Sequence, residues 1–585
     1  MKKMKRTLGL LLVLTMALTL FAGCGTPGAS KGPGGGAKTP TDEGAGILKL
    51  TAGRPLETLN PHQQAATTTA DFLNLVQGKL YRFAPGADGV GYEIIDELAD
   101  GAPVQVDEEG KIWRVRVRDG LVWSNGEPLT AEDILYSWQM CIDPQLLNHR
   151  SDAFHGSQVQ VVNALEYVTG EVKWEDVGIT LLEGNTLEFS LILPVTEFML
   201  KNFLSGLAVS VVYPPLYEAG MNAGRTETNY GTDVSKMVSS GPFVVTEWVQ
   251  GAEYTAMKNP HYLYKDRIWL AGVNTRVISE PGTIMQLFET GDVDLVSLSE
   301  ADYQRYREDP RVVEVPARSV QRIVINLLST NKPILQDERL RQALYYATDR
   351  ATCGQISSSL PANYIIPTTH VIDVENGTIY RDTAAAKAVL TPDHGYNPEL
   401  AKKLFNEAMA DAGLDKLSLQ LDYHEGVEAR RAVSEYLQEQ WRQIFDGRLQ
   451  ITLQAVPSSQ LAAKLRDFPN NVNAFELGWT GTGHDDFDPV SCLAHYYSKT
   501  DQRKGPYFSN EYDALYEAIL KLPINDMQGR LELIADAEKV MLRDASFVPV
   551  TQGVELALIS DRVKLMSDGW SIALGYGWEW AKIEE

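Results

Sequence analysis

The stretch from residue 397 to residue 480 restricts the possible fold more than any other part of the chain. Asn397-Pro398 predicts the start of a helix, because Asn is a favoured N-cap and proline fits the first helical position. Alternating leucines predict a strand over 417–421, helical spacing of apolar residues predicts a helix over 433–444, and renewed alternation predicts a strand over 449–453. Strand, helix and strand in this order form a right-handed βαβ unit with parallel strands, so we expect an α/β fold.

A further strand is expected over Ala474–Trp479, and the segment after it is a candidate for function. Residues Thr480–Pro489 would leave the carboxyl end of this strand, which is the edge where open α/β sheets bind ligands. We interpret Gly481-Thr482-Gly483 as a turn in that loop. The next residues, His484-Asp485-Asp486, include two acids that would repel phosphate, so a phosphate-binding loop is not expected.

The amino terminus has the composition of a secretory leader. Basic residues precede the apolar run 7–24, which is shorter than a membrane-spanning helix requires and ends in small residues. Ala22-Gly23 directly before Cys24 resembles a bacterial lipobox, in which the leader is removed and the cysteine carries lipid. We therefore expect a signal peptide over 1–23, and a lipidated Cys24 followed by a flexible Gly- and Pro-rich tether over 24–46. The alternative is an ordinary secreted protein in which Cys24 has no role.

Charge and cysteine usage exclude several classes of function. The formal net charge is −24, and the leader carries only basic charges, so the rest of the chain is more acidic still and is not expected to bind nucleic acid. Besides Cys24, the cysteines are widely spaced and lie outside any Cys/His cluster, so we interpret them as buried free thiols rather than as disulfides or zinc ligands. These are Cys141, Cys353 and Cys492. No motif for nucleophilic, metal or nucleotide chemistry is present, and neither a cofactor nor a metal is expected.

Five motifs, in order along the chain, resemble those of a known family. Residues 123–138, WSNGEPLTAEDILYSW, are similar to the signature of the extracytoplasmic solute-binding proteins of the peptide/nickel class, which feed ABC importers. Their opening Trp-Ser-Asn-Gly is most typical of the oligopeptide-binding branch. The other similar stretches are Glu57–Pro61, Ser240–Tyr262, Asp337–Arg350 and the helix that begins at Pro398.

The resemblance implies a two-lobed α/β fold of the periplasmic-binding-protein type (class II, cluster C), with a hinge and an extra inserted domain. Lobe I is expected in residues 47–82, 238–318 and 546–585, the small inserted domain in 83–237, and lobe II in 319–545. Closure of the lobes would bury the ligand, and no covalent step is implied, so the protein is not expected to be an enzyme.

The same resemblance assigns a candidate ligand site to the acidic stretch after Trp479. In peptide-binding members, the aspartate of the pattern Trp-x-x-Asp-Tyr-x-(Asp/Glu)-Pro binds the α-ammonium of the ligand. Counting back from Pro489 places Asp485 at that position; Asp486 stands where the pattern has tyrosine, and extra residues separate Asp485 from Trp479. We expect Asp485 or Asp486 to bind the amine, with helix capping and a cation site as alternatives. Trp479 is a candidate wall of the pocket, and core packing is its alternative.

The residues and the resemblance together predict a monomeric protein held by lipid at the outer face of the cell membrane. It would capture an oligopeptide and deliver it to ABC permease subunits. Dipeptides, oligosaccharides, nickel chelates and signalling peptides are alternative ligands, and nickel is disfavoured because the histidines are not clustered. A peptide sensor and, least favoured, a surface hydrolase are the alternative functions.

Overall fold

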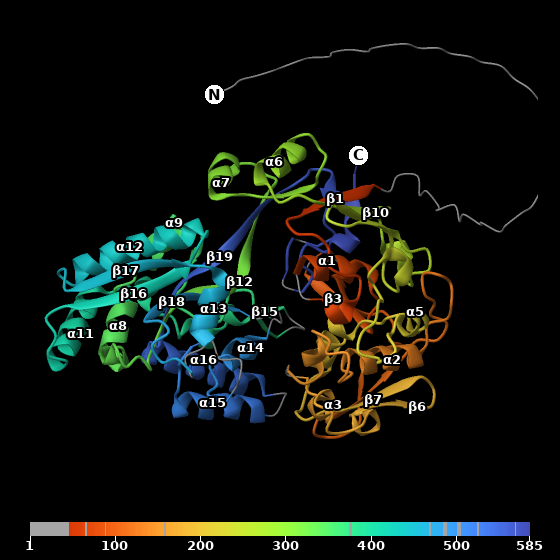
Figure 1. Cartoon of the computed structure of the whole chain (residues 1–585), viewed down its shortest axis with the longest axis horizontal. Coiled ribbons are helices and arrows are strands. Elements are labelled where there is room, and N and C mark those ends of the chain that lie inside the picture. The colour runs from red at the N-terminus through yellow and green to blue at the C-terminus, as the bar shows by residue number, and fades with distance from the viewer. Residues whose placement is uncertain are drawn as a thin grey trace, which may run out of the picture. The chain divides into compact units, whose positions relative to one another are not determined.

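The structure is a computed structural model of the chain (Figure 1). It describes residues 46–584 except 65–66, 88, 90, 157–158, 374–376, 467–469, 484–487, 500–504, 523–525, 568 and 572. Residues 44–585 belong to one unit of the chain. The expected signal peptide, Cys24 and the tether up to residue 45 lie outside the described residues.

Three larger sheets organise the described part of the chain. Their strand orders are β1–β10–β9–β8, β4–β5–β7–β6 and β11–β19–β12–β18–β16–β17, with β13 also paired to β19. The strands of the first sheet are β1 (Ile47–Ala52), β8 (Phe243–Val249), β9 (Glu253–Lys258) and β10 (Gly272–Val277). Those of the second are β4 (Val104–Gln105), β5 (Ile112–Arg116), β6 (Ile179–Leu182) and β7 (Thr186–Ser190). Those of the third are β11 (Leu295–Ser297), β12 (Val312–Ile325), β13 (Leu360–Pro361), β16 (Leu417–His424), β17 (Leu449–Val456), β18 (Leu477–Gly483) and β19 (Phe547–Ile559).

Short hairpins and the helices complete the fold. The hairpins pair β2 (Tyr81–Pro85) with β3 (Tyr92–Asp96), β14 (Val371–Asp373) with β15 (Thr378–Ile379), and β20 (Val563–Lys564) with β21 (Lys582–Ile583). The helices before β12 are α1 (Thr67–Val76), α2 (Ala131–Cys141), α3 (Ala164–Val168), α4 (Glu197–Phe203), α5 (Pro214–Ala219), α6 (Pro281–Glu289) and α7 (Glu300–Tyr306). Those after it are α8 (Glu338–Tyr346), α9 (Arg350–Ile356), α10 (Ala384–Lys387), α11 (Pro398–Asp411), α12 (Glu428–Ile444), α13 (Ser458–Arg466), α14 (Pro489–Ala494), α15 (Asn510–Lys521) and α16 (Met527–Asp544).

The βαβ prediction for the region after residue 397 is confirmed. The helix α11 begins where expected, because the side chain of Asn397 accepts the Leu400 N–H at 3.0 Å. The strands β16 and β17 run parallel, and α12 connects them and packs on both (Figure 1). Leu437 and Trp441 on the inner face of α12 are fully buried, in a hydrophobic core that the unit shares with α8, α11, β12 and β19.

The strand expected over Ala474–Trp479 lies further along the chain. β18 begins at Leu477 and continues to Gly483, paired antiparallel with β12 over its whole length and parallel with β16 at its start. The turn expected at Gly481-Thr482-Gly483 is therefore wrong. The physical reason is that β12 supplies backbone partners for this glycine-rich stretch, which local sequence cannot reveal.

Two long strands connect different parts of the third sheet. One end of the β12–β19 pair lies beside β11, where Val312 is opposite Leu558, and the other end lies beside β18 (Figure 1). Their register shifts between Pro316 and Val320, which marks an irregular stretch within β12. The first sheet lies within the ranges expected for lobe I, the second within the inserted domain, and the βαβ unit within lobe II. The domain boundaries themselves stay predictions.

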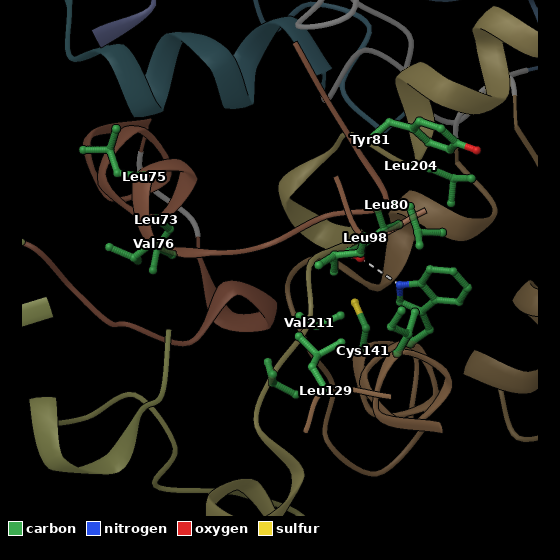
Figure 2. Close-up of a cluster of buried hydrophobic side chains, with 14 of the residues drawn as sticks. Leu73, Leu75, Val76, Leu80, Tyr81, Leu98, Leu129, Cys141, Leu204 and Val211 are labelled. Atoms are coloured by element: carbon green, nitrogen blue, oxygen red, sulfur yellow. Dashed lines mark hydrogen bonds between the residues drawn. The ribbon is translucent and has the colours of Figure 1, made fainter. Parts of the chain in front are cut away.

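The cysteines that the structure describes are buried free thiols, as interpreted from the sequence. Figure 2 shows Cys141 of α2 in a cluster of apolar side chains that includes Leu129 and Val211. Burial raises the pKa of the Cys141 thiol to about 12, and that of Cys353 to about 12 as well. Both thiols are therefore protonated at neutral pH and act as small apolar side chains.

Candidate functional site

The carboxyl ends of β16 and β18 meet the first turn of α12 at one edge of the third sheet. We call the residues gathered there the edge cluster; they are Gln321 of β12, His424 of β16, Arg430 of α12, and Trp479 and Gly481 of β18. Because β16 and β18 are parallel, their carboxyl ends lie on the same side. This is the kind of edge where open α/β sheets bind ligands.

Trp479 lies in the hydrophobic core, with one ring face turned to Arg430. Its side chain is 1% exposed, and its indole N–H donates to the Ser434 hydroxyl at 2.8 Å. The Arg430 guanidinium carbon lies 4.6 Å from the ring centroid, a cation–π contact. In this structure Trp479 is thus a core residue that supports Arg430, and direct contact with a ligand stays a prediction.

Arg430 is a half-buried cation that has no counter-charge among the described residues. Its Nη2 donates to the Gln321 Oε1, and among the described residues no carboxylate forms an ion pair with it. Burial lowers the pKa of Arg430 to about 10, so the guanidinium stays charged at neutral pH. A guanidinium has five N–H donors, so this one retains donors for a further acceptor.

His424 adds an imidazole ring to the edge cluster. Its Nδ1 is buried, and within the described residues it has no hydrogen-bond partner. Burial, and then the nearby charge of Arg430, lower the pKa of His424, so its ring is neutral at neutral pH. The edge cluster therefore offers one fixed positive charge and further donor capacity, which suits an anionic group of a ligand.

Of the three acids in the stretch after β18, the structure describes only Asp488. Asp485 and Asp486 lie outside the described residues, so amine binding by either stays a prediction. Asp488, the third acid of the stretch, caps α14 by accepting the Val490 N–H at 2.8 Å, and it also pairs with Arg530. Among the described residues, no cluster of three His, Cys, Asp or Glu side chains could hold a metal ion.

Sequence reasoning missed Arg430 and Gln321. Arg430 lies among Glu428, Arg431 and Glu435, a charge pattern typical of a solvated helix face. The available signal was its position in the first turn of a helix that follows the carboxyl end of a strand. Gln321 carried no local signal, because its contact with Arg430 joins residues far apart in the chain.

The fold and this edge define a two-lobed α/β binding protein of the periplasmic-binding-protein type, class II. The model of the bacterial extracellular solute-binding proteins, family 5, matches residues 93–504, and the chain belongs to this family. Proteins of the family bind solutes and are not enzymes. None of the helices in the described part of the chain has the length and apolar character needed to cross a bilayer.

Several known proteins are similar to most of the chain. A dipeptide-binding protein of Lactococcus lactis is 26% identical over 479 residues, which are 80% of this chain and 83% of that protein. The oligopeptide-binding protein OppA of Bacillus subtilis is 24% identical, over 77% of this chain and 80% of its own. The crystal structure of an oligopeptide ABC transporter substrate-binding domain from Bacillus anthracis has a TM-score of 0.69 and 21% identity, and covers 92% of this chain and 99% of its own.

Proposed function

We propose that this protein is a lipid-anchored substrate-binding protein that captures oligopeptides outside the membrane and delivers them to an ABC importer. The peptide-binding relatives support the ligand class. The observation that carries the proposal is Arg430, a half-buried cation at the carboxyl edge of the sheet with no carboxylate partner among the described residues.

The charge of Arg430, which no carboxylate among the described residues pairs with, favours a ligand that carries a carboxylate. Taking a cation partly out of water is costly unless an anion or several acceptors face it. The ring of Trp479 and the amide of Gln321 offset only part of this cost. The ring contacts one face of the guanidinium, and the amide oxygen accepts from one of its N–H groups. A peptide's terminal carboxylate matches the planar guanidinium with two parallel hydrogen bonds.

The acidic stretch after β18 supplies the opposite charge in this proposal. Asp485 is four residues beyond Gly481, so covalent geometry limits the separation of their Cα atoms to about 14 Å. An extended peptide spans about 3.5 Å per residue. A short peptide can therefore place its ammonium group at Asp485 or Asp486 and its carboxylate at Arg430.

Delivery requires that occupancy changes the shape of the protein. The long strands β12 and β19, with the register shift after Pro316, have the form expected of a hinge between lobe I and lobe II. A ligand held by both lobes would favour the closed form. A permease that binds this form preferentially would then bind mainly the protein that carries a ligand. The anchor would be the lipid on Cys24 with the tether that follows it, and the protein would act as a monomer.

The test is titration calorimetry of the full chain with one tripeptide in three forms: free, C-amidated and N-acetylated. Arg430→Gln is expected to weaken binding of the free peptide by about 10- to 100-fold, because a hydrogen bond to a charged group contributes about 1.5–3 kcal/mol. The amidated form should lose little. Asp485→Asn should weaken binding of the free peptide, which carries a free amine, more than binding of the N-acetylated form.

Arg431→Gln is the matched control for the arginine variant. Arg431 is the next residue on α12, is exposed, and already pairs with Glu428 and Glu435. Its replacement should leave all affinities within about twofold. If Arg430→Gln affects the free and the amidated peptide equally, the ligand's carboxylate does not bind at Arg430 and the proposed site is wrong.

A further inference from the structure

Gln321 is the side chain that fixes the orientation of Arg430. Its Oε1 accepts from Arg430 Nη2, and its Nε2 donates to the Ser319 hydroxyl at 2.9 Å. Because a guanidinium only donates, the amide must turn its oxygen toward Arg430, and its NH₂ group is then left to face Ser319. The two contacts therefore specify one orientation of the amide.

Gly481 provides the space in which this amide lies. Gln321 and Gly481 are directly opposite each other in the β12–β18 pair. A Cβ atom at position 481 would lie 3.1 Å from Gln321 Oε1 and 3.4 Å from its Nε2, which is closer than most real Cβ contacts. A glycine inside a strand often marks such a close approach, and here the approaching group is the Gln321 amide.

Ser319, the other partner of the amide, belongs to an irregular part of β12. It lies in the stretch where the register with β19 shifts, between Pro316 and Val320. Gln552 of β19 is fully buried and donates to the Ala317 carbonyl at 2.8 Å, which fixes this irregular backbone. The orientation of Arg430 is thus tied, through Gln321 and Ser319, to the strand that we propose as part of the hinge.

We propose that Gln321 is a positioning residue that determines specificity for a free carboxylate, by holding the Arg430 guanidinium over Trp479 and leaving its other N–H groups to the ligand. The proposal rests on the proposed role of Arg430. It names Gly481 as the residue that leaves room for the amide, since a Cβ atom there would push the amide by a few tenths of an ångström. The ligand class that it selects is a peptide with a free C-terminus, in preference to the same peptide as an amide.

The experiment compares the affinity ratio of a free tripeptide to its C-amidated form for variants of the full chain. Gln321→Glu should lower this ratio at least tenfold, because the new carboxylate pairs with Arg430 and competes with that of the ligand. Gln321→Met should lower it severalfold, since it removes the amide contact without adding a charge. Gly481→Ala should lower it by a smaller factor, since its Cβ atom shifts the amide without removing it. Gln450→Glu is the control, because it adds the same charge to β17 at an exposed position of the same sheet.

The ratio separates positioning from a merely structural role. If the Gln321 variants weaken both forms of the peptide equally, or leave the ratio as in the wild type while Arg430→Gln lowers it, the inference about Gln321 is overturned and the proposed function stands. If neither Arg430→Gln nor the Gln321 variants change the ratio, the proposed role of Arg430 as the carboxylate site fails as well. A fall in the ratio for Gln321→Glu and Gly481→Ala, with no change for Gln450→Glu, supports the inference.

Discussion

Replacement of Trp479 by phenylalanine or leucine separates the two contributions of this side chain. Phenylalanine removes the indole N–H that bonds to Ser434 but retains an aromatic face toward Arg430. The lost hydrogen bond contributes about 1 kcal/mol, and the cavity left by the missing ring atoms adds about 1 kcal/mol. Trp479→Phe should therefore lower the free energy of unfolding by about 2 kcal/mol.

Leucine removes the aromatic face as well. The cation–π contact at 4.6 Å contributes about 1 kcal/mol to holding Arg430 in place. Without it, the affinity for a peptide with a free carboxylate should fall about fivefold. Trp479→Phe should leave that affinity within about twofold, because its ring still faces the guanidinium.

Urea denaturation and calorimetry with free and amidated peptides measure the two effects. Trp441→Leu is the matched control: Trp441 is fully buried in the same core, and within the described residues its indole N–H has no partner. It should lose stability without a change in affinity. If Trp479→Leu lowers the affinity for both peptides equally, Trp479 acts as a pocket wall. If it leaves the affinity for the free peptide unchanged, its ring does not hold Arg430. Either result refutes the reasoning.

Two further predictions concern the anchor and the fold. Cys24→Ser should move the full chain from the membrane to the soluble fraction of cells with its peptide affinity unchanged, and a variant that stays on the membrane would contradict the lipid anchor. Arg381→Met should lower the free energy of unfolding by about 3–5 kcal/mol in urea denaturation, because it leaves the fully buried Glu538 without the guanidinium 2.6 Å away. Arg442→Met, which breaks an exposed pair on α12, should cost less than about 1 kcal/mol, and a similar small loss for Arg381→Met would mean that the buried pair matters little.

The parts of the fold that the sequence predicted have local physical causes. The start of α11 follows from the Asn397 side chain and the proline after it, and these act within one helical turn. The alternation of apolar residues in β16 and β17 records which face of each strand is buried. The helix between the two strands makes them parallel.

The parts that the sequence did not predict depend on contacts between distant segments. Gly481 is a turn former in isolation, and it is part of a strand here because β12, far away in the chain, pairs with it. Arg430 has the neighbours of a solvated helix residue, yet Trp479 and Gln321 enclose it. Contacts with distant segments therefore decide where β18 ends and whether Arg430 lies at the site. Those segments are outside any local window of sequence.

The acidity of the whole chain and the positive charge of the edge cluster are compatible because they act over different distances. At physiological ionic strength, charges on the surface are screened beyond about 8 Å, so most of the formal charge of −24 is not felt at the site. Arg430 is half-buried, and its attraction for a carboxylate in contact is screened much less. The orientation of a zwitterionic peptide then depends on the few charges that touch it. Arg430 lies at the carboxyl edge of the sheet, and no carboxylate among the described residues forms an ion pair with it, so the proposed function places the carboxylate end of the peptide there.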